Sequence, residues 1–333
     1  MSVIAITIGD YNGIGPEVAL KSAASRTIRG NCTPLLIGPY KAFEYYAEKY
    51  SLRRKILRVG SPSDAVGRSE ITIFDNEEHF TERIRPGKLT KEAGLSAGRA
   101  IETAVKLCME NQAVAMVTAP LSKEALRMAG YNYPGQTEMV TKLSNCRRSI
   151  MVMASGFARV ALATIHIPLS EVPKALTKEV VLERLSLFNE SIKVDFGVKS
   201  PRVAVLGLNP HAGENGLIGR EENDIIRPAI LEANSLKINA VGPFPADAFF
   251  GTYREGLFDG ILAMYHDQGL IPLKMKSFSS GINFTAGIDI IRTSPDHGTA
   301  FDIAGKGIAN PSSTIEAIKL ALDIARNRKA TRK

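Results

Sequence analysis

The segment that organises this chain reads Leu262-Ala263-Met264-Tyr265-His266-Asp267-Gln268-Gly269, an apolar, strand-like run that ends on a His-Asp pair. We predict that three polar residues suited to an anionic ligand follow on short strand-like segments: Lys274, Asn283 and Arg292. Farther on, residues 297–311 read HGTAFDIAGKGIANP. The small residues and polar anchors of this part are typical of a loop that lets a flat, anionic cofactor lie close to the backbone. We therefore expect substrate chemistry and cofactor binding in one cleft.

Length and composition indicate a globular protein of two lobes. The chain has 333 residues, of which 44% are hydrophobic and 23% charged, and a single core rarely grows much past about 250 residues. No apolar run reaches the roughly 20 residues that span a bilayer. Residues 1–5 lack the basic region and cleavage site of a secretory signal. We expect a cytoplasmic protein without membrane contact.

Cysteine and charge distribution argue against two further classes of protein. The three cysteines are widely spaced and form no CxxC pair, so a disulfide framework or a cysteine zinc site is not expected. The net charge is 42 − 34 = +8, and five basic residues stand in the tail: Arg326, Arg328, Lys329, Arg332 and Lys333. Because no basic, aromatic-interleaved face accompanies them, we interpret the tail as a frayed, solvated end and expect no nucleic-acid partner.

Strands that alternate with helices predict a largely parallel sheet in the first lobe. Val3–Ile8 is an apolar run that stops at the glycine-rich turn Gly9–Glu17, where Pro16 suits a first helical turn. This turn matches neither GxGxxG nor GxxxxGK[ST], and taken alone it is equally well explained as a tight connection. The pattern continues with strands at 33–37, 71–74 and 113–118 and with a long helix at 91–110.

The second lobe is predicted to contain a mixed sheet. Residues 149–154 and 158–164 flank Ser155-Gly156-Phe157, which indicates an antiparallel hairpin. Further strands are expected at 202–206 and 260–265, a loop at 241–247, and helices at 178–195, 221–235 and 312–328. We expect a two-lobed α/β fold with largely parallel or mixed sheets. One lobe comprises residues 1–130 plus 296–333, the other residues 131–295, and the active site lies in the cleft between them.

Three of the five histidines share one local setting. His166, His211 and His266 each follow an apolar run beside a turn-forming residue, and ligands of open α/β sheets gather where strands end. Three neutral imidazoles with an open position form a catalytic metal site of the zinc type. Taken singly, each is better explained as an ordinary loop or core histidine. His79 has no such setting, and we predict that it lies on the surface.

Two aspartates accompany these histidines. Asp247 and Asp267 are suited to orient a ligating imidazole or to take a proton, although a turn-stabilising role explains each equally well. Lys274 is a third candidate for catalysis. Arg292 lies in Ile290–Ser294, a run too apolar for an ordinary exposed edge strand, and this favours a functional guanidinium.

Several of these motifs together resemble the 4-hydroxythreonine-4-phosphate dehydrogenase family of pyridoxal phosphate biosynthesis. The motifs span essentially the whole chain and are Gly9–Glu17, Val117–Pro120, Gly207–Glu214, Ala263–Gly269 and Arg292–Gly298. The loop His297–Pro311 is also similar to the adenine-binding loop of isopropylmalate and isocitrate dehydrogenases. The resemblance implies the fold of those enzymes.

The resemblance also implies an activity and its residues. It implies NAD-dependent oxidation and decarboxylation of 4-phosphohydroxy-L-threonine to 3-amino-2-oxopropyl phosphate, in a homodimer whose metal ligands come from both subunits. Zinc is the expected metal, with cobalt or magnesium as alternatives. NAD is expected rather than NADP, because no Arg stands between residues 297 and 311. The implied metal ligands are His166, His211 and His266; the substrate-binding residues are Gln136, Thr137, Lys274, Asn283 and Arg292; the cofactor-binding residues are His297, Asp302 and Asn310.

The chain departs from the family pattern at two places. Gly135-Gln136 stands where the family has Gly-His, and Tyr11-Asn12 stands where it often has Pro-Ala. Glutamine donates a hydrogen bond but never carries a positive charge, so a threonate or erythronate 4-phosphate remains an alternative substrate. A metal-dependent hydrolase is an alternative of another class. The loop at residues 297–311 argues against it, because a hydrolase has no use for a dinucleotide platform.

Overall fold

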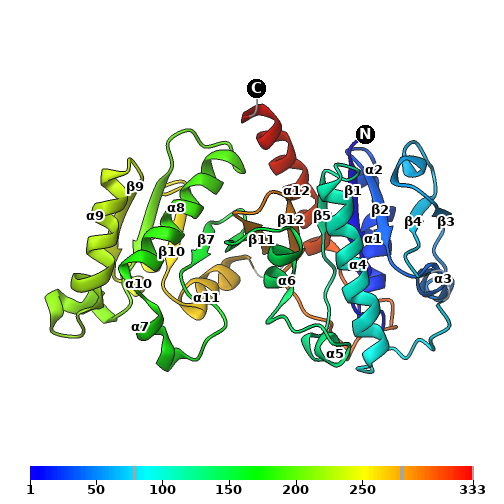
Figure 1. Cartoon of the computed structure of the whole chain (residues 1–333), viewed down its shortest axis with the longest axis horizontal. Coiled ribbons are helices and arrows are strands. Elements are labelled where there is room, and N and C mark those ends of the chain that lie inside the picture. Colours follow the sequence, from blue (N-terminus) through cyan, green and yellow to red (C-terminus); the bar gives the residue numbers. More distant parts are fainter. Residues whose placement is uncertain (78–79, 278–280, 332–333) are drawn as a thin grey trace. The chain divides into compact units, whose positions relative to one another are not determined.

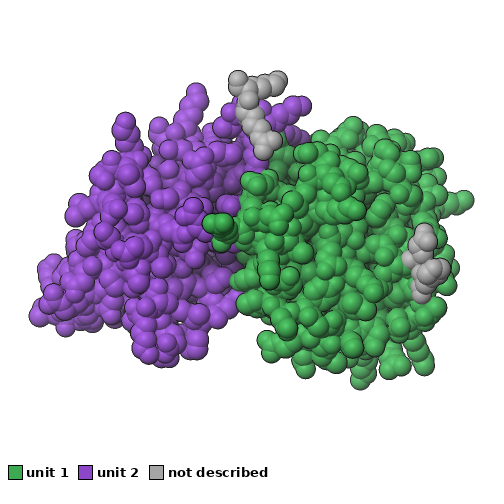
Figure 2. Space-filling model, in the orientation of Figure 1, with its two compact units in different colours: residues 1–147, 288–325 green, residues 148–287, 326–333 purple. Residues whose placement is uncertain are grey.

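The computed structural model describes residues 1–77, 80–277 and 281–331 (Figure 1). The chain divides into two compact units, drawn in green and purple in Figure 2. Unit 1 comprises residues 1–147 and 288–325, and unit 2 comprises residues 148–287 and 326–333. The chain therefore leaves unit 1 later than the expected boundary at residue 130, because α6 (Gln136–Leu143) packs against α4 (Lys91–Met109). It returns at residue 288 rather than 296.

The strands of unit 1 are all paired in parallel, in the order β3-β4-β2-β1-β5-β12. They are β1 (Val3–Thr7), β2 (Thr33–Ile37), β3 (Ile56–Val59), β4 (Ile71–Phe74), β5 (Ala115–Val117) and β12 (Arg292–Pro295). Every residue of β1, β2, β5 and β12 is buried, as is typical of parallel strands covered on both faces. The predicted parallel sheet is confirmed. β3 was not predicted, because only one of its four residues is buried.

The helices of unit 1 pack on this sheet and on one another. They are α1 (Gly15–Ala24), α2 (Arg26–Arg29), α3 (Tyr40–Lys49), α4, α5 (Lys123–Met128), α6 and most of α12 (Ser312–Thr331), with a 3-10 turn at Pro62–Ala65. Two glycines of α4 permit close contacts outside the sheet, since a Cβ at Gly94 would overlap Ala125 of α5 and a Cβ at Gly98 would overlap the ring of Tyr131. Ser122 caps α5 by accepting a hydrogen bond from Ala125 N (3.2 Å).

Unit 2 contains a mixed sheet in the order β11-β6-β7-β10-β8-β9. Its strands are β6 (Ile150–Ala154), β7 (Arg159–Leu162), β8 (Arg202–Leu206), β9 (Asn239–Phe244), β10 (Gly260–Ala263) and β11 (Ile282–Ala286). β6 pairs antiparallel with both β7 and β11, and the remaining pairs are parallel. The predicted hairpin and the predicted mixed sheet are confirmed.

The helices of unit 2 complete its core. They are α7 (Val172–Ala175), α8 (Lys178–Val194), α9 (Arg227–Ser235), α10 (Ala246–Thr252) and α11 (His266–Ser277), with 3-10 turns at Leu169–Glu171 and Pro210–Gly216 and a π-helical turn at Glu222–Ile226. Phe249 and Phe258 lie in a core cluster with Leu162, Leu206 and Ile261. None of the described helices is long and apolar enough to span a membrane.

Three local expectations are wrong. Residues 241–247 form the end of β9 and the start of α10 rather than a loop. Lys274 lies on helix α11 rather than on a strand, because Leu270 and Leu273 are buried at helical spacing. The tail is helical to Thr331 rather than frayed, and Arg328 Nε donates to Asp195 Oδ1 at 2.6 Å. Residues 332 and 333, like His79, lie outside the described residues.

Candidate functional site

The glycine-rich turn after β1 is held from two sides within unit 1. Asp10 N donates to Pro120 O (2.9 Å), just after β5, and Ile14 N donates to Thr299 O (3.0 Å) in the loop at residues 297–311. Gly13 leaves no room for a side chain, since a Cβ there would lie 2.8 Å from Thr299 O. The turn therefore lies at the carboxyl ends of β1 and β5, which is where open α/β sheets bind ligands.

An ion pair on α1 fixes the backbone of the loop at residues 297–311. Glu17 is buried, and its Oε1 accepts hydrogen bonds from Ala309 N (2.8 Å) and Lys21 Nζ (2.7 Å). Lys21 Nζ also donates to the carbonyl oxygens of Gly307 and Ala309, each at 2.9 Å. The loop is thus a preformed element of unit 1. This role was not predicted from the sequence, although a Glu and a Lys four residues apart were the signal for such an ion pair.

The departure at Tyr11-Asn12 has a structural role in unit 1. Asn12 Oδ1 accepts from Arg85 N (2.7 Å), and Asn12 Nδ2 donates to Thr90 Oγ1 (3.1 Å). Tyr11 is buried, and its carbonyl oxygen accepts from the hydroxyl of Tyr46 (2.7 Å). These two residues therefore fasten the turn to the segment at residues 85–90 and to α3.

Asp10 is a buried carboxyl in the same turn. Its Oδ1 accepts from Asn12 N at 2.8 Å. Its Oδ2 is buried and has no hydrogen-bond partner among the described residues. Burial raises the pKa of Asp10 to about 6. The carboxyl therefore changes charge in a mildly acidic range.

Arg292 forms a buried cationic centre in unit 1. The residue is only 2% exposed. Its Nε and Nη2 donate to Thr118 Oγ1 at 3.0 and 2.7 Å, and its Nη1 donates to Thr137 Oγ1 at 3.3 Å. Burial lowers the pKa of Arg292 to about 10, with the nearby Glu138 acting in the opposite direction. The guanidinium therefore stays charged at neutral pH.

Gln136 completes the surroundings of this guanidinium. Its Oε1 accepts from Arg292 Nη2 at 3.0 Å, and its Nε2 donates to Ala119 O at 3.5 Å. Because an arginine offers only donors, the amide oxygen must face it, and this contact fixes the orientation of the amide. The structure thus brings together three of the five expected substrate-binding residues. Thr118 belongs to the same centre, although the sequence analysis gave it no role.

The three expected cofactor-binding residues differ in their surroundings. His297 is half-buried, and burial lowers the pKa of its imidazole, so the ring is neutral at pH 7. Asp302 is exposed. Asn310 Oδ1 accepts from Ser312 N (3.0 Å) and Ser312 Oγ (2.6 Å) at the start of α12. The side chain of Asn310 therefore has a helix-capping role, whatever it contributes to a ligand.

Two of the three expected metal ligands lie together in unit 2. The ring centroids of His166 and His266 are 5.9 Å apart. His266 is the first residue of α11, and its Nδ1 lies 2.7 Å from Asp267 Oδ1. An ionised carboxylate only accepts hydrogen bonds, so we place the proton on Nδ1, which leaves Nε2 with its lone pair. Asp267 therefore orients the imidazole as metal sites require.

His211 lies in a turn of unusual backbone. Residues 211–215 all have left-handed backbone angles, with φ between 40° and 76°, and such a conformation costs a non-glycine residue roughly 1–3 kcal/mol. In the described part of the chain, no group of three His, Cys, Asp or Glu side chains is arranged to hold a metal ion. The predicted meeting of all three histidines is thus not found within one chain.

A buried carboxylate holds the loop that carries His211. Glu222 is 1% exposed. Its Oε1 accepts from Leu208 N and Asn209 N, each at 2.7 Å, and its Oε2 accepts from Asn209 Nδ2 at 3.0 Å. A Cβ at Gly213 would lie 2.5 Å from Glu222 Oε2, so the turn closes directly over the carboxylate. These contacts offset the cost of the left-handed backbone, and sequence patterns gave no sign of them.

The remaining candidates also lie in unit 2. Asp247 is exposed in the first turn of α10. Lys274 is half-buried on α11. Asn283 lies on β11, and its Oδ1 is buried without a hydrogen-bond partner in the part of the chain that the structure describes. A buried acceptor of this kind costs free energy unless a ligand donates to it.

Comparison with known proteins supports the resemblance. The family model described as pyridoxal phosphate biosynthetic protein PdxA matches residues 30–321. A 4-hydroxythreonine-4-phosphate dehydrogenase of Bacteroides thetaiotaomicron is 42% identical over 326 residues, covering 98% of this chain and 89% of the relative. A relative from Bradyrhizobium diazoefficiens, described as a D-threonate 4-phosphate dehydrogenase, is 40% identical and covers 99% of this chain and 98% of its own.

Solved structures support the same family and the same fold. The crystal structure of 4-hydroxythreonine-4-phosphate dehydrogenase from Klebsiella pneumoniae has a TM-score of 0.89 and 37% identity, covering 97% of this chain and 98% of that one. Isocitrate dehydrogenase from Methylococcus capsulatus, at 15% identity and a TM-score of 0.50, shares the fold, which confirms the predicted fold class. The chain is a dehydrogenase that belongs to the PdxA family of pyridoxal phosphate biosynthetic proteins.

Proposed function

We propose that this protein catalyses the NAD-dependent oxidation and decarboxylation of 4-phosphohydroxy-L-threonine to 3-amino-2-oxopropyl phosphate, in pyridoxal phosphate biosynthesis. The observation that carries this proposal is the charged guanidinium of Arg292, which is buried and surrounded by Thr118, Thr137 and Gln136. A charged guanidinium held in place by hydroxyl and amide oxygens is suited to bind an anion in a two-pronged contact. A phosphorylated hydroxy acid supplies two anionic groups.

Few residues of the chain are candidates for the proton transfers of this reaction. When bound, NAD would accept the hydride that leaves the substrate carbon as the hydroxyl loses its proton. The carboxylate would then leave as carbon dioxide, and the electron pair left behind, held as an enolate, would take up a proton on carbon. Asp267 is committed to His266 Nδ1, so we assign it the orientation of that imidazole. Asp247 and Lys274 remain as the candidates for moving a proton.

Two imidazoles in unit 2 fit a divalent metal. His166 and His266 are neighbours, and the Nδ1 of His266 is occupied by Asp267, which directs Nε2 to a ligand. We propose that these two and His211 hold zinc, with cobalt or magnesium as alternatives, and that a second subunit completes the set. When bound, the metal polarises the substrate hydroxyl and stabilises negative charge on oxygen during loss of carbon dioxide. Asn283, with its buried acceptor, and Lys274 would bind the substrate.

The loop at residues 297–311 is the proposed NAD platform. Its backbone at 307–309 is fixed by Glu17 and Lys21, and a rigid loop lowers the entropy that a cofactor loses on binding. His297 adds a neutral ring with a buried Nε2 that has no partner among the described residues. We propose NAD rather than NADP for want of an Arg in this loop.

A homodimer in the cytoplasm is proposed as the working form. Ile271 and Met275 of α11 stand one helical turn apart and are 55% and 82% exposed. This is the helix that begins with His266. An exposed apolar pair on the helix that carries a proposed metal ligand is suited to contact with a second copy of the chain.

A second substrate is supported by a relative, since the 40% identical protein of Bradyrhizobium diazoefficiens is described as a D-threonate 4-phosphate dehydrogenase. Gln136 is neutral, and its amide is already engaged by Arg292 and by Ala119 O. The group formed by Arg292, Gln136 and Thr137 therefore has one cation, whereas a histidine at position 136 would allow two. D-threonate 4-phosphate or D-erythronate 4-phosphate, which lack the amino group of 4-phosphohydroxy-L-threonine, are the alternatives to test.

The test is reduction of NAD at 340 nm with each of the three phosphorylated substrates in turn. We expect turnover with 4-phosphohydroxy-L-threonine, and its loss in His166→Ala and His266→Ala together with loss of bound metal. Because His166 and His266 are neighbours in one chain, mixing inactive His166→Ala with inactive His211→Ala should restore part of the activity if His211 comes from the other subunit. Turnover with only a threonate or erythronate phosphate would support the alternative substrate. Release of phosphate without NAD would indicate a hydrolase and contradict the proposal.

A further inference from the structure

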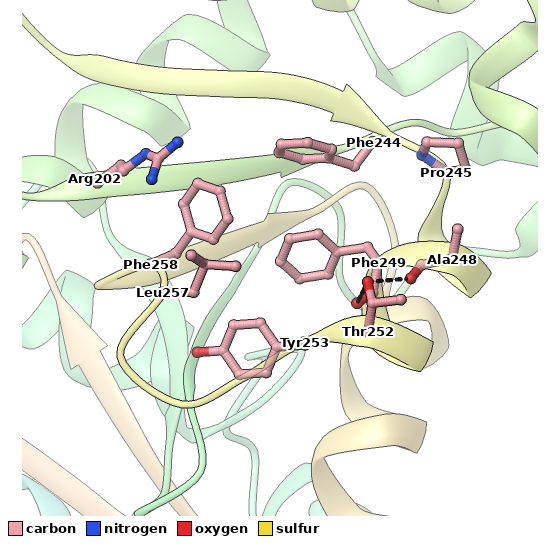
Figure 3. Close-up of a pocket in the computed structure, with 9 residues that line it drawn as sticks. All are labelled: Arg202, Phe244, Pro245, Ala248, Phe249, Thr252, Tyr253, Leu257 and Phe258. Carbon is pink, nitrogen blue, oxygen red and sulfur yellow. Dashed lines mark hydrogen bonds between the residues drawn. The ribbon is translucent and has the colours of Figure 1, made fainter.

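A cavity in unit 2 is lined by none of the candidate site residues (Figure 3). Its volume is about 360 Å³, which is near the lower end of the range for small-molecule sites. The lining comes from the start of β8, the end of β9, α10 and the segment between α10 and β10. A single-ring compound is the size of ligand that such a space accepts.

Aromatic rings form one side of this cavity. The ring centroid of Phe249 lies 5.3 Å from that of Phe244 and 5.8 Å from that of Phe258, and Phe244 and Phe258 are 5.7 Å apart. Tyr253 adds a fourth ring, 5.4 Å from Phe249. Phe249 and Phe258 belong to the core of unit 2, so their rings are held by packing. Rings fixed in this way suit a flat aromatic ligand, which gains from offset or edge-to-face contacts.

Arg202 supplies a charge at the same cavity. Its guanidinium carbon lies 4.6 Å from the centroid of the Phe258 ring. Its backbone N–H donates to Asp259 Oδ2 (2.8 Å), but its side chain forms no ion pair with any described residue. Stacking fixes the plane of a guanidinium and leaves its N–H edge for an anion, which it binds in a two-pronged contact.

The hydroxyls of Thr252 and Tyr253 are the other polar side-chain groups at the cavity. Thr252 Oγ1 already donates to Ala248 O at 2.8 Å, one of the contacts drawn as dashed lines in Figure 3. A sugar or polyol needs several polar partners, and this lining offers few. The chemistry favours one apolar ring with one anionic group.

We propose that this cavity binds a small aromatic carboxylate, with its ring against Phe244 and Phe249 and its carboxylate on Arg202. The inference does not depend on the proposed dehydrogenase substrate. The ligand would contact α10, the helix that carries Asp247.

The test is a titration of the full-length protein with 4-fluorobenzoate, followed by ¹⁹F NMR without NAD or substrate. We expect saturable binding that Arg202→Met weakens about tenfold or more, as loss of a charge-assisted contact predicts. The control variant Arg227→Met removes a charge from an exposed residue of α9 and should leave the affinity unchanged. Thr252→Phe should fill the space and abolish binding.

Four results of this titration would overturn the proposal. They are absence of saturable binding, equal binding of the neutral 4-fluorobenzamide, full affinity in Arg202→Met, and full affinity in Thr252→Phe. Should Arg202→Met fail to fold, Thr252→Phe and the benzamide comparison still decide the question. If binding is lost as rising protein concentration drives self-association, a second copy occupies the cavity, and the proposal is also wrong.

Discussion

Replacing Glu222 by Gln tests whether one buried carboxylate holds the turn that carries His211. Gln retains an oxygen for Leu208 N and Asn209 N, but both bonds lose their charge assistance, at about 1 kcal/mol each. Its amide nitrogen would then face Asn209 Nδ2, donor against donor, where Glu222 Oε2 now accepts at 3.0 Å. Adding roughly 1 kcal/mol for that mismatch gives a loss of about 3 kcal/mol in the free energy of unfolding.

Calorimetry of the whole protein measures this loss. For a unit of this size, about 3 kcal/mol corresponds to a fall of about 6–12 °C in the melting temperature of unit 2. Glu221→Gln is the matched control, because among the described residues Glu221 accepts a hydrogen bond only from the side chain of Asn209 (2.7 Å), and it should cost under about 1 kcal/mol. If His211 is a metal ligand, Glu222→Gln should also weaken metal binding about tenfold. Equal melting temperatures for the two variants would refute the reasoning.

Three further predictions concern other buried groups. Arg328→Ala should lower the free energy of unfolding by about 3 kcal/mol in urea titrations, because it leaves the buried carboxylate of Asp195 without its cation. Asp195→Asn in the same chain should restore part of that loss, and an additive loss would contradict the idea. The pKa of Asp10 is raised from 3.8 to about 6, so its stabilising contribution is present at low pH and is lost as pH rises from about 4 to 6. Asp10→Asn should abolish this pH dependence of the free energy of unfolding, which amounts to at most about 3 kcal/mol. If the melting temperature of the variant changes with pH as that of the unaltered protein does, Asp10 is not the group responsible. In Gln136→Glu the new carboxylate should pair with the Arg292 cation, so KM for an anionic substrate should rise about tenfold with little change in kcat. An unchanged KM would show that Arg292 and its neighbours do not bind the anion.

Much of the fold was predictable because its signals are local. β2, β4 and β8 have the predicted bounds, since each is a short apolar run between turn residues. β3 was not predicted because only its last residue is buried and because Arg58 interrupts its apolar run. The helical position of Lys274 escaped because the hydrophobic pattern of α11 is weak around Pro272.

The site was less predictable because its contacts are not local. Arg292 meets Gln136 and Thr137 across more than 150 residues of sequence, and only the family resemblance grouped them beforehand. The left-handed turn at His211 depends on a carboxylate at position 222. Backbone angles of this kind follow from tertiary contacts rather than from the propensity of the turn residues themselves.

The anchoring of the loop at residues 297–311 by α1 has a consequence for synthesis of the protein. Lys21 donates to carbonyl oxygens that lie 286 and 288 residues later in the chain, so these bonds form only after those residues are made. The strand β12, which pairs in parallel with β5, is also made late. When the ribosome has added residue 287, most of unit 2 is present, but β5 still has an open edge and unit 1 lacks residues 288–325. We expect the nascent chain to need protection of that edge until residue 295 has emerged, and chains truncated before residue 288 to aggregate rather than to fold.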